Sequence, residues 1–184
     1  MRTKRSLSLG EWAVLALLCE KPMHGYAVAA TMARDGEVGA IWSLGQPLTY
    51  RALTVLQGLD LVEVSGESPG DRAPRRTELS ATARGREQVE RWLAAPAPRP
   101  RDLRSELLLK ICLLRRRESS LLPLLDAQRS ALSARMAELE ADQAVASGTL
   151  ADVIRMRWLT ADAGLRFVEE LSERERQAAA GASA

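Results

Sequence analysis

The sequence predicts a mainly α-helical protein in two parts, with one short β-hairpin in the first part. Apolar residues recur at helical spacing through most of the 184 residues, and strand-like alternation replaces that spacing only around residues 61–80. A proline-alanine run at residues 95–100 is too stiff for a helix interior and separates the two parts. We therefore expect an N-terminal domain of residues 1–95, a linker of residues 96–101 and a C-terminal helical domain of residues 102–184.

The first two helices of the N-terminal domain are predicted from their starts. Ser8 stands three residues before Glu11, which is the spacing of a capping box, and the apolar pattern then runs to about Cys19. A second helix is predicted over residues 24–32, where Tyr26 shares a face with several alanines. We expect Tyr26 to pack into the core.

A third helix and a hairpin follow. Pro47 favours a helix over residues 46–57, since proline is well tolerated in a first turn. Strand-like runs at residues 61–64 and 76–80 flank a cluster of turn-forming residues, which predicts a hairpin with a long polar tip. A helix over residues 82–93 completes the domain. The inner face of the third helix is expected to consist of Leu48, Ala52, Leu53 and Leu56.

Three further helices are predicted beyond the linker, over residues 103–114, 120–146 and 150–176, and the chain from Arg174 onward is expected to fray. The last two helices carry more apolar surface than a helical hairpin covers by packing on itself. We therefore expect a homodimer that forms through these helices. The predicted interface residues are Leu125, Leu132, Met136, Leu139, Trp158, Leu159, Leu165 and Val168.

The order of three helices and a two-stranded hairpin is that of a winged helix-turn-helix. In this fold the third helix enters the major groove of DNA and the hairpin, or wing, contacts the flanking backbone. The formal net charge is only +2, but residues 46–57 contain no acidic side chain, and arginines gather in the hairpin and ahead of the first helix. We therefore expect double-stranded DNA as the partner. The predicted contacts are Arg2, Lys4, Arg5, Gln46, Thr49, Tyr50, Arg51, Arg72, Arg75 and Arg76.

Three segments carry a pattern that points to one family. They are His24-Gly25-Tyr26, then Pro47-Leu48-Thr49-Tyr50-Arg51-Ala52-Leu53 with Leu56, and Pro74-Arg75-Arg76 followed by Thr82 and Gly85. With these segments, residues 7–95 resemble the PadR-like transcriptional regulators. The resemblance implies a ligand-responsive repressor that binds an inverted-repeat operator as a homodimer, through helix 46–57 and the wing at residues 66–76. It also implies that Tyr50 contacts the phosphate backbone and that a helical tail forms the dimer.

The resemblance has two departures and one further implication. Family members usually have a glycine where Asp60 stands, and an aromatic residue commonly follows the arginine pair of the wing, where this chain has Thr77-Glu78-Leu79. Some relatives hold a flat aromatic ligand between tryptophans near the dimer seam. Packing in the core or at an interface is the alternative role for these side chains. The candidates for binding a small aromatic or hydrophobic effector are Trp12, Trp92 and Trp158.

Catalytic and metal-binding functions are not expected. His24 is the only histidine, and the glycines between residues 36 and 45 lack the spacing and the lysine of a phosphate-binding loop. We therefore expect neither an enzyme nor a cofactor or metal. The alternative function is that of a winged helix that binds another protein and no specific DNA.

The compartment is expected to be the cytoplasm. No segment approaches the roughly 18 consecutive apolar residues of a membrane span. The apolar run after the basic start is interrupted by charges and has no cleavage site of a signal peptide. Cys19 and Cys112 lie far apart in helical patterns, which is typical of reduced thiols.

Overall fold

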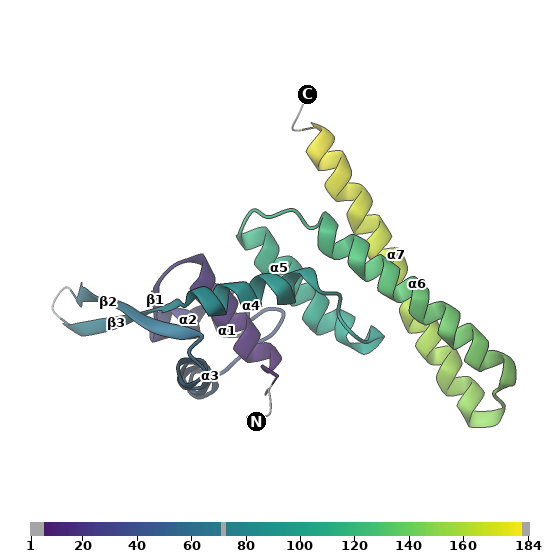
Figure 1. The fold of residues 1–184 in the computed structure, drawn as a ribbon, viewed down its shortest axis with the longest axis horizontal. Coiled ribbons are helices and arrows are strands. Elements are labelled where there is room, and N and C mark those ends of the chain that lie inside the picture. The colour runs from purple at the N-terminus through teal and green to yellow at the C-terminus, as the bar shows by residue number, and fades with distance from the viewer. Residues whose placement is uncertain (1–5, 71–72, 182–184) are drawn as a thin grey trace. The chain divides into compact units, whose positions relative to one another are not determined.

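A computed structural model describes residues 6–70 and 73–181, and for residues 67–70 and 73–76 it describes the backbone (Figure 1). The chain forms two compact units, Met1–Trp92 and Leu93–Ala184. The elements of the first are α1 (Leu9–Glu20), β1 (Met23–His24), α2 (Gly25–Met32), α3 (Gln46–Gly58), β2 (Val62–Gly70), β3 (Ala73–Ala81) and α4 (Ala83–Ala94), which ends just past the boundary. Those of the second are a 3-10 turn (Pro100–Asp102), a π-helical turn (Leu103–Leu107), α5 (Leu108–Arg116), α6 (Leu122–Val145) and α7 (Gly148–Gly181). The predicted winged helix-turn-helix with a C-terminal helical region is confirmed.

The start of α1 is fixed by the predicted capping box. The backbone N–H of Glu11 donates to Ser8 Oγ at 3.3 Å, and the N–H of Ser8 donates to Glu11 Oε2 at 2.7 Å. The residues from Ala13 to Leu18 are all fully buried, so α1 is a core helix.

α2 begins where the sequence predicts but buries a different face. His24 Nδ1 accepts a hydrogen bond from the N–H of Ala27 at 3.0 Å and thereby caps the helix, so the lone histidine has a structural role. The prediction that Tyr26 packs into the core is wrong, because its side chain is 64% exposed. The buried residues of α2 are Val28, Ala29 and Met32, so the helix buries its larger apolar side chains, Val28 and Met32, and leaves Tyr26 outside.

The hairpin is longer than predicted. β3 lies between β1 and β2 in an antiparallel sheet, and Val64 of β2 pairs with Leu79 of β3 (Figure 1). The predicted long tip is wrong, because Gly66 and residues 68–70 belong to β2. Two shifts of register, between Val64 and Gly66 and between Ser68 and Gly70, accommodate the turn-forming residues within the strand. The two-residue β1 is too short to show an alternation in sequence.

Asp60 makes the turn between α3 and β2. Its backbone has φ +56°, a left-handed conformation that aspartate tolerates better than most residues and that glycine adopts at no steric cost. This conformation explains why a glycine is usual at this position in the family that the sequence resembles. Thr82 Oγ1 donates to the carbonyl of Asp60 at 2.9 Å and ties the turn to the start of α4.

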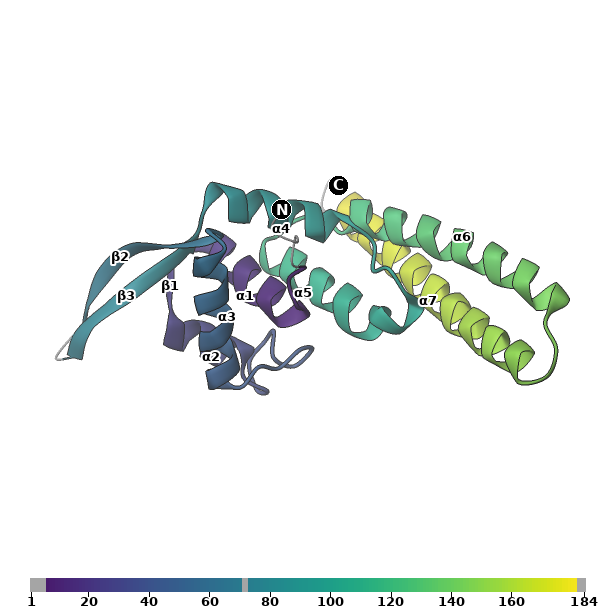
Figure 2. The same ribbon diagram turned by 60° about the horizontal axis from the view of Figure 1, so that its bottom comes forward.

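The second unit is built on α6 and α7, which lie side by side (Figure 2). α7 continues to Gly181, so the expectation that the chain frays from Arg174 is wrong. Arg174 pairs with Glu170, and Gln177 Nε2 donates to Glu173 Oε1 at 2.8 Å. These pairs four residues apart, followed by alanines, support the last turns of the helix.

Half of the predicted dimer seam is buried within one chain. Leu125, Leu132, Leu139 and Val168 are each at most 3% exposed, so they form the interior of the second unit rather than a free interface. Met136, Trp158 and Leu165 are half-buried, and Leu159 is exposed. Helical periodicity identified buried positions correctly, but the partner that covers four of them is the chain itself.

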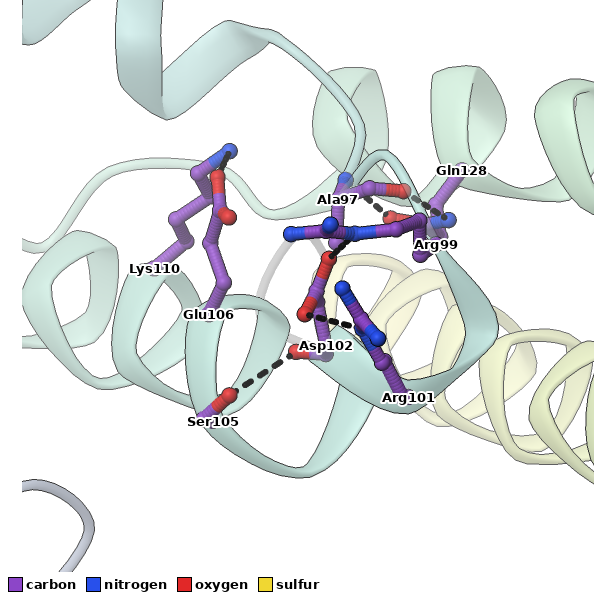
Figure 3. Close-up of polar contacts among 8 residues, drawn as sticks. All are labelled: Ala97, Arg99, Arg101, Asp102, Ser105, Glu106, Lys110 and Gln128. Carbon is purple, nitrogen blue, oxygen red and sulfur yellow. Dashed lines mark hydrogen bonds and ion pairs between the residues drawn. The ribbon is translucent and has the colours of Figure 1, made fainter. Parts of the chain in front are cut away.

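The proline-alanine segment is fastened within the second unit by buried polar groups (Figure 3). Gln128 of α6 is 1% exposed, and its amide binds both backbone groups of Ala97. Its Oε1 accepts from the N–H at 2.7 Å, and its Nε2 donates to the carbonyl at 3.4 Å. Lys110 Nζ of α5 donates to the carbonyl of Ala95 at 2.8 Å. Both ends of the stretch 95–97 are therefore held by side chains of the helices that follow it.

Candidate nucleic-acid interface

The outward face of α3 is polar and carries no negative charge. Gln46, Tyr50 and Arg51 are exposed, as are Thr54 and Gln57 farther along the helix. Arg51 has no ion pair or side-chain hydrogen bond within the described residues, so its guanidinium is available to a ligand. This face supplies hydrogen-bond donors of the kind that bind phosphate oxygens and base edges.

Two neighbouring residues of α3 exchange the roles that the sequence predicts. Thr49 is fully buried, and its Oγ1 donates to the carbonyl of Gly45 at 3.3 Å. The sequence predicts that Thr49 contacts DNA, but its buried side chain does not reach the surface. Leu48 is 54% exposed, although it was expected on the inner face. Leu48 and Thr49 can each share a helical face with Ala52 and Leu53, so the spacing of apolar residues fits the burial of either one. The hydroxyl of Thr49 is satisfied by the turn before it, and this makes its burial inexpensive.

The ring of Tyr50 is positioned by the first residue of α2. A methyl group at Gly25 would lie 2.8 Å from Cε1 of Tyr50, so the ring rests directly on the glycine backbone. Tyr50 nevertheless remains 43% exposed. Gly25 thus allows a close approach that orients an exposed aromatic side chain next to the start of a helix.

Tyr26 is a candidate contact that the sequence analysis missed. It lines an open groove of about 370 Å³ together with Gln46, the first residue of α3. An exposed phenol beside the start of α3 can donate to a phosphate oxygen. α2 has no charged residue in its sequence, so its pattern did not show which side faces solvent.

Only some of the basic residues that are predicted to contact DNA from the wing and from the segment before α1 lie within the described residues. Arg75 and Arg76 belong to β3, where Arg76 pairs with Ser68 of β2. Arg2, Lys4, Arg5 and Arg72 lie outside the described residues.

Two arginines of α4 have structural partners. Arg86 Nη1 donates to the carbonyl of Cys19 at 2.9 Å, and Arg84 Nη1 donates to the carbonyl of Leu59 at 3.3 Å. These carbonyls lie at the C-terminal ends of α1 and α3, where a cation is favoured by the helix dipole. We assign these two arginines to the fold rather than to a ligand.

The three candidate tryptophans belong to two different units. Trp12 and Trp92 stack in parallel with ring centroids 5.1 Å apart, which leaves no room for a third ring between them. Trp158 belongs to the second unit, where its Nε1 donates to Glu140 Oε1 at 2.9 Å and the guanidinium carbon of Arg155 lies 4.8 Å from its ring centre. A flat ligand sandwiched by Trp12 and Trp92 therefore requires these rings to move apart.

Within residues 6–70 and 73–181, no group of three histidine, cysteine or carboxylate side chains converges to hold a metal ion. The helices in the described part of the chain are all too short or too polar to cross a membrane.

Comparison with known proteins finds similarity at the level of structure only. No protein-family model and no curated sequence matches the chain. PadR of Bacillus subtilis in complex with operator DNA is 17% identical, with a TM-score of 0.47 over 96% of this chain and 99% of that one. The same protein in complex with p-coumaric acid is 16% identical, with a TM-score of 0.42 over 95% of this chain and 99% of that one. A PadR-like transcriptional regulator of Bacillus cereus is 16% identical, with a TM-score of 0.41 over 95% of this chain and 96% of that one.

Proposed function

We propose that this chain is a PadR-like transcriptional regulator, a cytoplasmic repressor that binds an inverted-repeat operator as a homodimer. The observation that supports this function best is the exposed, acid-free face of α3, with Gln46, Tyr50 and Arg51 on it. In this proposal Tyr50 anchors the phosphate backbone, Gln46 and Arg51 contact base edges, and the wing at residues 66–76 lies along the flanking DNA. Repression then requires only that the bound dimer occludes a promoter.

The operator is sought by footprinting the DNA upstream of the protein's own gene, where protection of an inverted repeat would establish both the target and its symmetry. Protection of a single, asymmetric site would contradict the dimeric mode of binding. Band-shift titration over a range of salt then separates DNA binding from the protein-interaction alternative. That alternative predicts no salt-dependent shift, whereas phosphate contacts make the affinity fall steeply with salt.

Arg51→Ala is expected to weaken binding to the protected operator by about 10- to 100-fold, because a bidentate contact to a base is worth roughly 1–3 kcal/mol. Arg91→Ala is the matched control, since Arg91 is exposed on α4 and its ion pair is with Glu87 of the same helix. The control should bind like the wild type in the same band-shift assay. Equal losses in both variants would mean that α3 does not read the operator.

We place the dimer contact on the exposed apolar side of α7. Leu150, Val153, Met156 and Phe167 are between 39% and 66% exposed, although each is a large apolar residue. Met156 and Phe167 are eleven residues apart, about three turns, and lie on a side of α7 different from the one that buries Ile154 and Val168. Leu150 and Val153 lie in the first two turns of the helix. We call these four residues the α7 stripe. Its burial against a second copy would remove a patch that a soluble monomer rarely exposes.

Met156→Glu is expected to convert the dimer to monomer at micromolar concentration, because the substitution buries a carboxylate in an apolar interface. Sedimentation velocity measures this change. Val145→Glu is the control, since Val145 is 88% exposed at the end of α6 and does not belong to the α7 stripe. A wild type that sediments only as monomer, or a Met156→Glu variant that stays dimeric, would contradict this interface.

Regulation by a small aromatic or hydrophobic effector is the last part of the proposal. An effector that binds one spacing of the two subunits better than another would separate the two α3 helices from their half-sites. Trp12 and Trp92 remain the candidate site in the first unit, and Trp158 in the second. Release of the operator in a band shift, together with a change in tryptophan fluorescence, would identify such a compound.

A further inference from the structure

Leu48 is an apolar side chain on the polar face that we propose to contact DNA. Among the described residues of the first unit it is the only strongly exposed leucine, at 54%. It lies in the first turn of α3, which is the part of a recognition helix that approaches the bases most closely. About half of its surface is therefore not packed within the chain.

Leu48 and Arg51 lie next to each other on the surface. Both line a depression of about 210 Å³ beside the first residues of α1. Glu11 also borders it, but this residue is 6% exposed and its carboxylate accepts the N–H of Ser8 at 2.7 Å. The depression therefore presents an apolar surface and a guanidinium side by side, with little negative charge to repel DNA.

The major groove offers one apolar group that matches such a surface. The 5-methyl group of thymine is the only apolar substituent on a base edge there, and arginine binds the O6 and N7 atoms of guanine. Residues three apart on a helix have Cβ atoms roughly 5–6 Å apart, and successive base pairs are about 3.4 Å apart. Leu48 and Arg51 can therefore contact bases one or two steps apart.

Building on the proposed DNA binding, we propose that Leu48 recognises the methyl group of a thymine that lies one or two base pairs from the guanine bound by Arg51. Each operator half-site then contains this thymine-guanine combination. Leu48 contributes specificity through its contact with one methyl group, and Arg51 supplies most of the directional hydrogen bonding.

The test uses the full-length protein and duplexes selected from random-sequence DNA. Each thymine of the selected duplex is replaced in turn by deoxyuridine, which lacks only the methyl group and pairs identically with adenine. At one position in each half-site, the replacement should weaken wild-type binding about fourfold, which corresponds to the burial of one methyl group. Leu48→Ala should bind the thymine and deoxyuridine duplexes equally well.

Three outcomes would overturn the proposal. The first is wild-type binding that is indifferent to deoxyuridine at every position, and the second is a Leu48→Ala variant that still prefers thymine. In either case the DNA-binding proposal stands if the Arg51→Ala variant binds the selected duplex more weakly than the wild type does. The third is failure to select any duplex, which would remove the proposed function together with this inference. Val145→Ala is the control and should keep the wild-type preference for thymine, and thermal melts should show that all variants fold.

Discussion

Gly85→Ala is expected to lower the free energy of unfolding by about 3 kcal/mol, at the upper end of the cost of overfilling a packed site. A methyl group at Gly85 would lie 2.3 Å from the carbonyl oxygen of Leu61 and 3.2 Å from Cδ1 of Leu15. The carbonyl cannot move aside freely, because it accepts the N–H of Thr82 at 3.0 Å. Relief of the clash must therefore shift α4 away from the start of β2.

Gly58→Ala is the matched control for this prediction. The substitution is the same and lies in the same unit, but no atom beyond its chain neighbours and its own helix backbone lies within 4 Å of the added methyl group. Because alanine is the better helix former, Gly58→Ala should leave stability unchanged or raise it by about 0.5 kcal/mol. Thermal denaturation of the full-length protein measures both, and a loss near 3 kcal/mol corresponds to roughly 6–12 °C in Tm. Similar melting temperatures for the two variants would show that the contact at Gly85 is not tight.

The N-terminal fold could be predicted because its elements begin with local signals. The capping box of Ser8 and Glu11 and the proline at position 47 each specify a helix start within a few residues of sequence. The order of the elements then sufficed for the winged helix. Gly85 belonged to the family resemblance, but the carbonyl of Leu61 that excludes a side chain there is a tertiary contact, and no sequence pattern reveals it.

The choice of buried face was less predictable. In α2 and at the start of α3, two different faces carry enough apolar residues to be buried, so periodicity alone does not choose between them. The structure exposes Tyr26 and Leu48 and buries Thr49, and these differences change the candidate site. Each concerns a residue near a helix start, where the neighbouring turn decides which hydroxyl or ring is accommodated.

The second unit shows a further limit of sequence patterns. Periodicity indicated that Leu125, Leu132 and Val168 are buried, but it does not say whether their partner is the same chain or a second copy. The clamp on the linker was also invisible, since Gln128 and Ala97 lie 31 residues apart. The sequence predicts a semi-rigid linker at the proline-alanine run, and it gives no sign that side chains of α5 and α6 bind the backbone there.

Lys110→Met is expected to lower the free energy of unfolding by about 3 kcal/mol, because it breaks a buried ion pair by removing one partner. The side chain of Lys110 is fully buried, and its ammonium lies 2.8 Å from Glu106 Oε1 (Figure 3). It also lies 2.8 Å from the carbonyl oxygen of Ala95. Methionine fills a similar volume but donates no hydrogen bond. The substitution therefore leaves the carboxylate and the carbonyl without this donor while it preserves the packing.

Arg174→Met is the matched control, because Arg174 and Glu170 have the same four-residue spacing in the same unit but are 68% and 64% exposed. Solvent screening makes such a pair worth at most about 0.5 kcal/mol, so this variant should melt close to the wild type. The double variant Glu106→Gln with Lys110→Met should regain part of the loss, since it removes the stranded charge as well. A loss in Lys110→Met no larger than in Arg174→Met would show that the buried pair does not hold the proline-alanine segment.

The pH dependence of stability provides a second measurement on the same group. Burial lowers the pKa of Lys110 below its usual value of 10.5, and the hydrogen bond and charge of Glu106 oppose this effect only in part. Below the lowered pKa both the folded and the unfolded chain hold the proton, so Lys110 adds no pH dependence there. Between the lowered pKa and 10.5 the unfolded chain binds more protons, so the stability of the wild type relative to Lys110→Met must rise with pH across this window. A difference that stays constant up to pH 11 would mean that burial does not lower the pKa of Lys110, and a difference that falls would mean that the charge of Glu106 raises this pKa instead. Either result would contradict a dry contact between the ammonium and the Ala95 carbonyl.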